Sequence, residues 1–260
     1  MYFSKNLLDG NHIIVSGGAG SLGVAIIKGL LEHGALVSVN DVLSSEDALA
    51  RFVQAGINPQ NLQYVRGDLR ESAEVERFLQ LSRSRFGAIH TALCHAGVVT
   101  PAPLIDVEEH EWERTIDINL KSAFLLGKGA AKGMIADGVP GHLIFTTSWV
   151  AQAPWPDIGP YNTSKAGMNQ LMRSFARELA PARIRANAIA PGIVSAGMAK
   201  AQWESDSSYR ARAQKAIPLG FMQPLDSVVN AFLFLCSGAA SYMTGSVLLV
   251  DGGCSLYPMD

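Results

Sequence analysis

The fold of this chain is decided by the stretch Ser16-Gly17-Gly18-Ala19-Gly20-Ser21-Leu22-Gly23. A short apolar run at 12–16 precedes it and a helical apolar periodicity at 22–31 follows it, so the stretch joins a strand to a helix. Glycines at such a turn allow a tight bend and the close approach of a pyrophosphate, which the free N–H groups of the helix N-terminus can bind. We therefore predict that this turn binds a dinucleotide through Gly17, Gly20, Ser21, Leu22 and Gly23.

The alternation of strand and helix continues along the rest of the chain. Further strands are expected at 35–40, 62–65, 89–94, 143–148, 184–190 and 246–250. Several of them are continuous apolar runs, which is typical of strands that are covered on both faces. The pattern predicts an α/β fold with a doubly wound, seven-stranded parallel sheet and helices on both faces. Because no linker, repeat or low-complexity tract interrupts the pattern, we expect a single domain over residues 1–260.

Composition and charge exclude several kinds of function. The 260 residues are 48% hydrophobic, which is enough for one large domain with its own core. Charged residues make up only 17%, the net charge is −2 and no basic block stands out, so we expect no nucleic-acid partner. The three cysteines, Cys94, Cys236 and Cys254, lie far apart and offer neither a disulfide framework nor the spacing of a metal site. Residues 1–10 carry no apolar signal core, and together these features indicate a cytoplasmic protein.

One uncharged segment, 228–250, is long enough to span a bilayer. It is interrupted by Asn230, by Ser237-Gly238 and by Thr244-Gly245-Ser246. We therefore expect a buried helix, a turn and a buried strand in this segment, and no contact with a membrane.

Acidic residues follow the second and third predicted strands. Asp41 lies 24 residues after Gly17, where a carboxylate can accept hydrogen bonds from the ribose hydroxyls of an adenosine. It would repel a 2′-phosphate, and the sequence shows no arginine beside it, which favours NAD over NADP. The competing interpretation makes Asp41 a turn or helix-capping residue. Asp68, followed by Leu69, is expected either to contact the adenine or to cap the next helix.

The fourth predicted strand ends in Cys94-His95-Ala96-Gly97. Small residues at this position let the backbone pass close to a ribose, so His95, Ala96 and Gly97 are assigned to the cofactor site. His95 could serve as an acid or base, whereas a histidine bonded to neighbouring backbone is the plainer interpretation.

A helical stripe of apolar side chains contains a second chemical signal, Tyr161-Asn162-Thr163-Ser164-Lys165. Spacing of four places Tyr161 and Lys165 one turn apart on the same helix face. An ammonium beside a phenol favours the phenolate, so the pKa of Tyr161 is expected below its usual value of about 10. A tyrosine tuned in this way can take a proton from an alcohol. By itself the pair also fits an ordinary surface helix, and it gains weight only from the rest of the chain.

Two further strand ends complete the predicted site. Ser148 ends the fifth strand, at the edge where ligands bind in parallel sheets, and can orient a substrate oxygen or cap the strand. Trp149 and Trp155 follow, and they can wall a pocket or pack in the core. Beyond Pro191-Gly192 lies a long polar stretch at 193–217, called the lid segment below, because loops of this length over a strand end are often lids.

Together these motifs resemble the short-chain dehydrogenase/reductase family, in its branch of about 250 residues, and the similarity covers nearly the whole chain. The family's Thr-Gly-x-x-x-Gly-x-Gly loop is matched by Ser16, Gly17 and Gly23, whereas Ser21 replaces the middle glycine. Gly20 fits the Thr-Gly-x-x-Gly-x-x-Gly loop of longer members. The Asn-Asn-Ala-Gly motif is altered to Cys94-His95-Ala96-Gly97. Ser148 precedes Tyr161 by thirteen positions, as in the family.

The C-terminal part of the chain follows the family pattern with exceptions. Pro191-Gly192 matches the nicotinamide-side motif, and the resemblance implies cofactor contacts by Pro191, Gly192 and Val194. Ala196 stands where a threonine is usual, and Ser195 can substitute for it. The segments Ile217-Pro218-Leu219-Gly220 and Thr244-Gly245 to Asp251-Gly252-Gly253 also match, although Phe221 replaces a common arginine.

The resemblance implies a Rossmann-type fold and a mechanism. Asn119 would hold a helix kink and a proton-relay water, and Ser148 would hold the substrate oxygen. Tyr161 would remove the hydroxyl proton of a secondary alcohol, while Lys165 lowers the pKa of the tyrosine and binds the nicotinamide ribose. The hydride would pass to NAD, and the protein would supply position and proton handling. The runner-up activity is a 3-oxoacyl-thioester reductase, and a catalytically silent nucleotide-binding scaffold is the alternative from another class.

Two expectations concern partners. The helix at 112–136 is apolar nearly all round, which predicts a second buried side at a subunit interface and, by resemblance, a homotetramer. The expected substrate is a small sugar or polyol, because indoles offer flat apolar faces and an N–H donor. The residues assigned to it besides Ser148 and Tyr161 are Trp149, Trp155, Met198 and Trp203. Lid side chains that could bond its hydroxyls are Gln202, Glu204, Asp206, Ser207 and Ser208. The opposing interpretation is an apolar slot for a steroid or an acyl chain.

Overall fold

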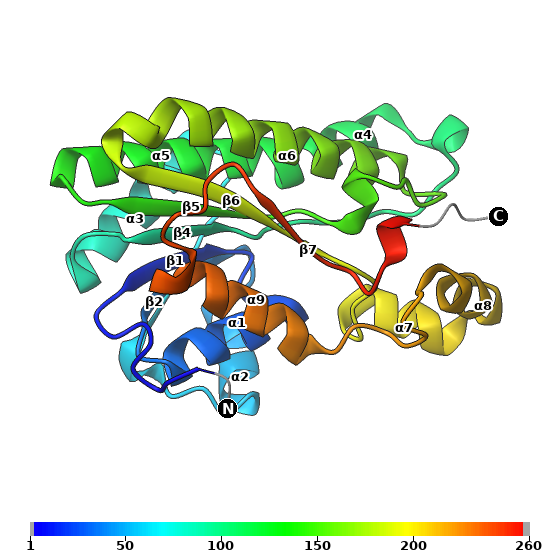
Figure 1. Cartoon of the computed structure of the whole chain (residues 1–260), viewed down its shortest axis with the longest axis horizontal. Coiled ribbons are helices and arrows are strands. Elements are labelled where there is room, and N and C mark those ends of the chain that lie inside the picture. Colours follow the sequence, from blue (N-terminus) through cyan, green and yellow to red (C-terminus); the bar gives the residue numbers. More distant parts are fainter. Residues whose placement is uncertain (1–2, 257–260) are drawn as a thin grey trace.

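A seven-stranded parallel sheet forms the centre of the molecule in the computed structural model, which describes residues 3–256 (Figure 1). The strand order is β3-β2-β1-β4-β5-β6-β7. The strands are β1 His12–Ser16, β2 Leu36–Asp41, β3 Leu62–Arg66, β4 Thr91–Cys94, β5 Gly141–Thr146, β6 Ile184–Pro191 and β7 Val247–Val250. The ends of each strand lie within two residues of the predicted ends, and the predicted fold class is confirmed.

Helices cover both faces of this sheet (Figure 1). On one face, α1, α2 and α9 share a hydrophobic core with β1 and β2. On the other face, α3, α5 and α6 pack over β4 and β5. The helices are α1 Ser21–Glu32, α2 Ser45–Gln54, α3 Ser72–Phe86, α4 Glu109–Ile116, α5 Ser122–Asp137, α6 Gly159–Leu179, α7 Gly197–Ser205, α8 Ser207–Ala216 and α9 Leu225–Cys236.

The turn after β1 lies where the strand order of the sheet reverses. β1 pairs with β2 on one side and with β4 on the other, so β2 and β3 extend the sheet in one direction and β4 to β7 extend it in the other. Gly17 has a φ of +66°, and a Cβ at this position would lie 2.6 Å from the Cα of Ala96. Only glycine allows this approach, which packs the turn onto the loop that follows β4. Ligands of doubly wound sheets bind at such a reversal point.

The predicted helix at 112–136 is interrupted near its middle. α4 ends at Ile116, Asp117–Lys121 form a π-helical turn, and α5 begins at Ser122. Asn119 lies within this turn and is fully buried. A π turn is a recognised cause of a helix kink, which agrees with the kink that the family resemblance implied at this residue.

The lid segment is helical rather than a loop. It contains α7 and α8, and the side chain of Asp206 caps α8 by accepting hydrogen bonds from the backbone N–H groups of Ser208 and Tyr209. Apolar residues are few and unevenly spaced in this segment, so no helical periodicity was visible in the sequence. The two helices pack on a hydrophobic cluster that includes Trp149, Trp155 and Tyr209.

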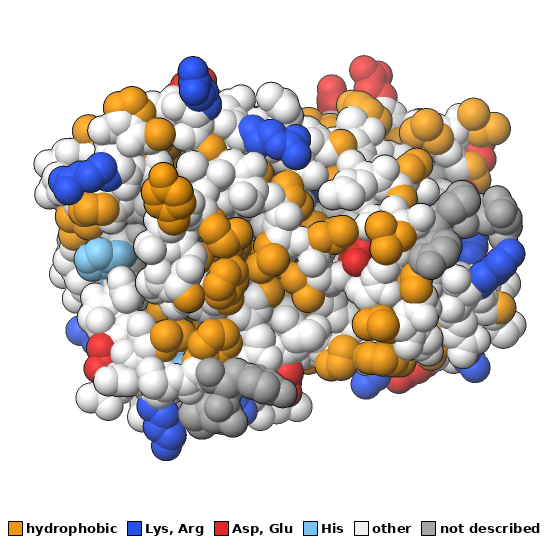
Figure 2. Space-filling view, in the orientation of Figure 1, with side chains coloured by type: hydrophobic (Ala, Val, Ile, Leu, Met, Phe, Trp, Pro, Cys, Tyr) orange, Lys and Arg blue, Asp and Glu red, His pale blue; other side chains and the backbone are white. Residues whose placement is uncertain are grey.

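The uncharged C-terminal segment folds as α9, a turn and β7. Each residue of β7 is only half-buried, because β7 is the last strand at one edge of the sheet, so the prediction of a buried strand is wrong. Hydrophobic side chains gather over the middle of the face on which β7 and α9 lie (Figure 2). Within residues 3–256, no helix combines the length and the hydrophobicity that crossing a membrane requires.

Candidate active site

A cavity of about 890 Å³ opens where the strands of the sheet end. Its walls come from the loops that follow β1 to β6 and from the lid segment. It brings together most of the residues predicted for the cofactor and the substrate, namely Gly17, Gly20, Ser21, Leu22, Asp41, Asp68, Leu69, His95, Ala96, Gly97, Ser148, Trp149, Trp155, Tyr161, Lys165, Pro191, Gly192 and Val194. Gly23, Asn119 and Trp203 lie outside the lining, and the side chain of Met198 lies outside the described part of the chain.

The glycine-rich turn fits a pyrophosphate. α1 begins at Ser21, and no side chain caps its N-terminus, so its first N–H groups are available to an anion at the cavity. Gly23 was expected to contact the ligand, but it packs inside the turn. A Cβ there would lie 2.8 Å from the carbonyl oxygen of Gly17, so this glycine allows the helix to approach the strand.

Asp41 lines the cavity at the end of β2, and Arg51 lines it as well. The carboxylate accepts hydrogen bonds from the backbone N–H groups of Ala19 at 3.0 Å and Val42 at 2.8 Å. Arg51, on α2, also lines the cavity and donates from Nη1 to the carbonyl oxygen of Ala19 at 2.9 Å. Arg51 and Asp41 thus bond to the same residue, Ala19, a proximity that the sequence did not show.

Asp68 lines the cavity but has a partner of its own. Its carboxylate forms an ion pair with Arg70, with 2.6 Å between Oδ2 and Nη2, and the hydrogen bond from Arg70 holds its pKa below the usual value. It also accepts a hydrogen bond from the backbone N–H of Arg70, whereas the N-cap of α3 is Glu71. Asp68 therefore shapes a turn, and the expected helix cap is not formed.

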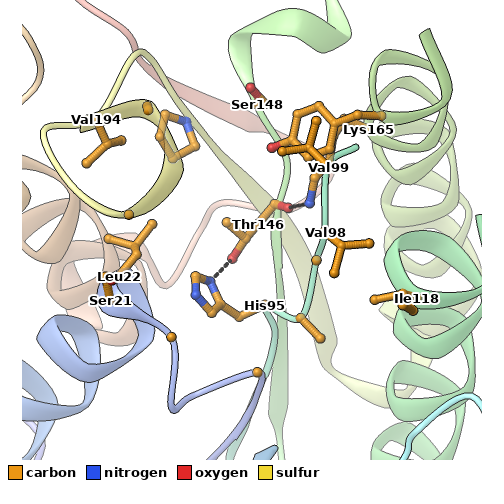
Figure 3. A pocket seen from close by; sticks show the side chains of 18 of the residues that line it. Ser21, Leu22, His95, Val98, Val99, Ile118, Thr146, Ser148, Lys165 and Val194 are labelled. Atoms are coloured by element: carbon orange, nitrogen blue, oxygen red, sulfur yellow. Dashed lines mark hydrogen bonds between the residues drawn. The ribbon is translucent and has the colours of Figure 1, made fainter. Parts of the chain in front are cut away.

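Ser148, Tyr161 and Lys165 all line the cavity, and Ser148 and Lys165 lie on one wall of it (Figure 3). Lys165 donates from Nζ to the carbonyl oxygen of Thr146 at 2.7 Å, and Nζ lies 5.4 Å from the centre of the Tyr161 ring. Burial lowers the pKa of Lys165 to about 8. Burial also raises the pKa of Tyr161, although a hydrogen bond with Ser148 opposes this shift. The expectation of a Tyr161 pKa below its usual value is wrong for this arrangement, because burial outweighs the hydrogen bond with Ser148.

Asn119 connects the kinked helix to the same wall. Its Oδ1 accepts from the backbone N–H of Val98 at 2.8 Å, and its Nδ2 donates to the carbonyl oxygen of Val98 and to Ser164 Oγ, both at 3.0 Å. A Cβ on Gly97 would lie 3.4 Å from Lys165 Nζ and 3.5 Å from Asn119 Oδ1. The Asn119 amide therefore fixes Val98, and the residue before it, Gly97, lies close to the Lys165 ammonium.

His95 forms part of the floor of the cavity beside Thr146 (Figure 3). Its Nδ1 is hydrogen-bonded to Thr146 Oγ1 at 2.9 Å, and its backbone N–H donates to Ser16 Oγ at 3.0 Å. Burial and the nearby charge of Lys165 lower the pKa of His95 to about 4, so the ring is neutral near pH 7. The partner of the ring is thus a threonine hydroxyl rather than the backbone group that the plainer interpretation expected.

Aromatic and aliphatic side chains wall the end of the cavity beyond Ser148. Trp149 meets Trp155 edge to face with ring centres 5.6 Å apart, and Trp155 meets Tyr209 in the same way at 5.9 Å. The other residues of this end include Val150, Ile158, Ile193, Ala199 and Gln202. Trp203 packs against the same cluster from outside the cavity, which corrects its predicted role as a wall of the pocket.

Most of the polar lid residues are occupied elsewhere. Asp206 caps α8 and accepts a hydrogen bond from Ser208 Oγ at 2.7 Å. Glu204 faces Lys200 at 3.9 Å on the exposed side of α7. Of the five polar lid residues that were expected to bond hydroxyls, only Gln202 lines the cavity. The end of the cavity beyond Ser148 is therefore largely apolar.

The chain is similar to known oxidoreductases over nearly its whole length. Residues 17–255 match the protein family described as Enoyl-(Acyl carrier protein) reductase. The chain is 31% identical over 254 residues to 3β-hydroxysteroid dehydrogenase 1 of Eggerthella lenta, covering 96% of each protein. It is also 31% identical over 256 residues to short-chain dehydrogenase reductase 3b of Arabidopsis thaliana, covering 97% of this chain and 98% of that protein.

A solved structure agrees with this relationship. A candidate gluconate dehydrogenase from Agrobacterium tumefaciens superposes with a TM-score of 0.89 at 27% identity, covering 98% of this chain and 100% of that chain. The chain therefore belongs to the short-chain dehydrogenase/reductase family of oxidoreductases.

Proposed function

We propose that this protein is an NAD-dependent dehydrogenase that interconverts a secondary alcohol and a ketone. The observation that carries the proposal is the meeting of Ser148, Tyr161 and Lys165 on one wall of the cavity that the glycine-rich turn also lines. Bound NAD would supply the hydride acceptor, and the cradle at Gly17 and the uncapped N-terminus of α1 fit its pyrophosphate.

The residues of the wall divide the proton handling among them. Tyr161 is the base that removes the hydroxyl proton of the alcohol, and Ser148 hydrogen-bonds the same oxygen and stabilises the phenolate. Lys165 holds a positive charge beside the ring while it stays anchored to Thr146. Asn119 holds the loop at Val98 and is proposed to support a water that passes protons to solvent.

Cofactor preference is proposed to favour NAD. Asp41 can accept hydrogen bonds from ribose hydroxyls, and its charge opposes a 2′-phosphate. The test compares kcat/KM for NAD and NADP with one substrate, and we expect a higher value for NAD. Asp41→Ala should narrow the difference, because repulsion and ribose hydrogen bonds are lost together. Equal values for the two cofactors in the unaltered enzyme would refute the preference.

The substrate supported best is a secondary alcohol on a bulky apolar molecule, such as a hydroxysteroid. The walls formed by Trp149, Trp155 and Tyr209 favour this class, and one relative of the chain is named a 3β-hydroxysteroid dehydrogenase. Burial of an apolar ligand against such walls stabilises it roughly in proportion to the area removed from water.

The second candidate is the small sugar or polyol expected from the sequence. Gln202 in the cavity and the gluconate dehydrogenase name of one structural relative favour it. One screen decides between the two classes, with NAD reduction measured on hydroxysteroids, sugars and polyols, 3-hydroxyacyl thioesters and simple secondary alcohols. We expect the highest kcat/KM for an apolar alcohol. If kcat/KM were highest for a polyol, the polyol would become the first candidate substrate. If no class of alcohol were turned over, the catalytically silent scaffold would be favoured.

The enzyme is proposed to act in the cytoplasm. The three cysteines, Cys94, Cys236 and Cys254, are free, and burial raises the pKa of each thiol, which suits a reducing compartment. The test is fractionation of the source cells, with the protein expected in the cytoplasmic fraction.

A further inference from the structure

One arginine on α2 turns away from its own helix and toward the cofactor cavity. Arg51 lies in the last turn of α2, where Asp47, one turn earlier, would be its usual partner. The carboxylate of Asp47 instead accepts a hydrogen bond from Ser44 Oγ at 2.7 Å. Arg51 donates to the carbonyl oxygen of Ala19 in the glycine-rich turn and lines the cavity.

Arg51 and Asp41 bond to the two backbone groups of the same residue, Ala19. The N–H of Ala19 donates to Asp41 Oδ2 at 3.0 Å, and its carbonyl oxygen accepts from Arg51 Nη1 at 2.9 Å. Both side chains therefore lie beside Ala19, at the end of the cavity proposed to bind the adenosine. A guanidinium carries five N–H donors, so Arg51 can bind a second acceptor while it keeps the bond to Ala19.

Charge pairing singles out Arg51 among the arginines of the cavity. Three arginines line it, and two of them have acidic partners: Arg70 pairs with Asp68 at 2.6 Å and Arg114 pairs with Glu111 at 3.3 Å. Arg51 forms no ion pair with any residue in the described range 3–256. It is thus a cation at the ribose end that no protein carboxylate neutralises directly.

We propose that Arg51 is a specificity residue that lets the adenosine end of this site accept a 2′-phosphate. A guanidinium matches the geometry of a phosphate and binds it through two parallel N–H···O bonds. Asp41 disfavours the same group by repulsion, so the pair sets the cofactor preference between them. This inference rests on the proposed cofactor site. With Asp41 alone the site would exclude NADP, whereas with Arg51 present NADP binds as a second, weaker cofactor.

The experiment compares two ligands that differ only in the 2′-phosphate, 5′-AMP and adenosine 2′,5′-bisphosphate. Their Kd values are measured by calorimetry on the unaltered full chain and on Arg51→Gln, Asp41→Asn and the double variant. Glutamine keeps an N–H donor for Ala19 but removes the charge. The matched control is Arg66→Gln, because Arg66 donates to the carbonyl oxygen of Val42 at 3.2 Å on the same sheet end but does not line the cavity.

Arg51→Gln should raise the Kd of adenosine 2′,5′-bisphosphate by about tenfold relative to the Kd of 5′-AMP, as expected for loss of a charge-assisted phosphate contact. Asp41→Asn should shift the ratio toward the bisphosphate, and the double variant should lose that gain. Arg66→Gln should leave the ratio unchanged. If Arg51→Gln leaves the ratio unchanged, or changes it no more than Arg66→Gln does, the role of Arg51 is wrong while the cofactor site stands. If 5′-AMP itself does not bind the unaltered chain, the proposed cofactor site and this inference both fail.

Discussion

Tyr161 carries the proposed chemistry at the scale of a single residue. Tyr161→Phe removes the hydroxyl that accepts and returns the proton, and we expect turnover to fall about 10²–10⁴-fold. Folding and the Kd for NADH should change little, because the ring keeps its packing at the cavity wall. The checks are steady-state kinetics and NADH fluorescence titration. If near-full activity remained, another group would be the base, and His95 would be the candidate, although its pKa of about 4 makes it a weak one.

Lys165 is expected to act on Tyr161 through its charge. A cation near the ring favours the phenolate, so its removal raises the pKa of the phenol. Alcohol oxidation rises with pH as Tyr161 ionises, and Lys165→Met should therefore move this limb of the kcat/KM profile to higher pH. Lys128→Met is the matched control, because that ammonium also lies 5.1 Å from an aromatic ring, that of Phe124, outside the cavity. An unmoved limb in Lys165→Met would disprove the coupling.

At the scale of elements, the lid helices are expected to form one wall of the substrate pocket. Tyr209 on α8 lines the cavity, whereas Trp203 on α7 packs on the same cluster from outside. Tyr209→Ala should lower kcat/KM for an apolar alcohol by about tenfold, since truncation removes one wall of the slot. Trp203→Ala should have a smaller effect on kcat/KM. Neither variant should change the Kd for NADH, and equal losses of kcat/KM would show that lid packing rather than wall contact matters.

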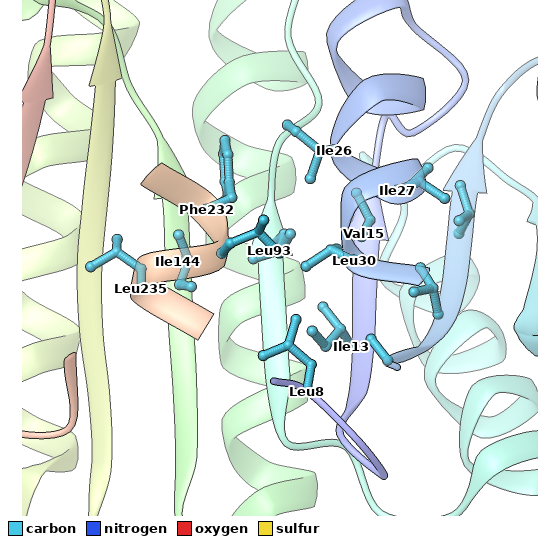
Figure 4. Packing of buried hydrophobic residues seen from close by; sticks show 14 of the residues in the cluster. Leu8, Ile13, Val15, Ile26, Ile27, Leu30, Leu93, Ile144, Phe232 and Leu235 are labelled. Carbon is cyan, nitrogen blue, oxygen red and sulfur yellow. The ribbon is translucent and has the colours of Figure 1, made fainter. Parts of the chain in front are cut away.

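The positions of the strands were predictable because several of them are continuous apolar runs in the sequence. Leu93 and Ile144 lie on neighbouring strands and pack against Phe232 and Leu235 of α9 (Figure 4). Once the strands were placed, the meeting of the residues at their carboxyl ends was also predictable, because parallel strands all end on the same side of a sheet. The location of Ser148 in the cavity follows from this rule.

Arg51 and Tyr209 could not be predicted as cavity residues. The sequence around Arg51 looks like an ordinary surface helix, and the sequence around Tyr209 shows no helical periodicity. The role of each residue depends on which way its helix faces after folding. The partner of Arg51 is a carbonyl oxygen 32 positions away, which no local pattern shows. The direction of the Tyr161 pKa was mispredicted because helix spacing reveals the neighbouring Lys165 but not the extent of burial.

The exposed apolar surface of the whole molecule supports the proposed homotetramer. Phe124 and Ile135 on α5 are 40% and 53% exposed, and Tyr242, just before β7, is fully exposed. These residues lie on two different parts of the fold, α5 and the segment before β7, and two different two-fold contacts generate a tetramer. Light scattering at micromolar concentration should give four times the monomer mass. Phe124→Glu should break one contact and give a smaller assembly, and a monomer mass for the unaltered protein would reject the proposal.

His12, His90 and His142 stand in a row near the starts of β1, β4 and β5, at the end of the sheet opposite the cavity. The backbone N–H of His90 donates to the carbonyl oxygen of His12, and that of His142 donates to His90, both at 2.9 Å. His12 and His142 are buried. Burial lowers the pKa of His12, and burial together with the charge of Arg185 lowers that of His142 to about 3.

A histidine whose pKa falls on folding stabilises the protein above its unfolded pKa of about 6.5 and loses that contribution as the pH drops toward the folded value. For His142 the loss is about 2 kcal/mol at pH 5, because the unfolded chain binds the proton that the folded chain refuses. Urea unfolding at pH 7.5 and pH 5, at one protein concentration, measures this difference in the free energy of unfolding. His142→Gln should shrink the difference by about that amount, whereas His110→Gln, which changes a histidine that is 73% exposed, should leave it unchanged. An identical pH dependence in His142→Gln and the unaltered protein would show that His142 is protonated in the folded state at pH 5.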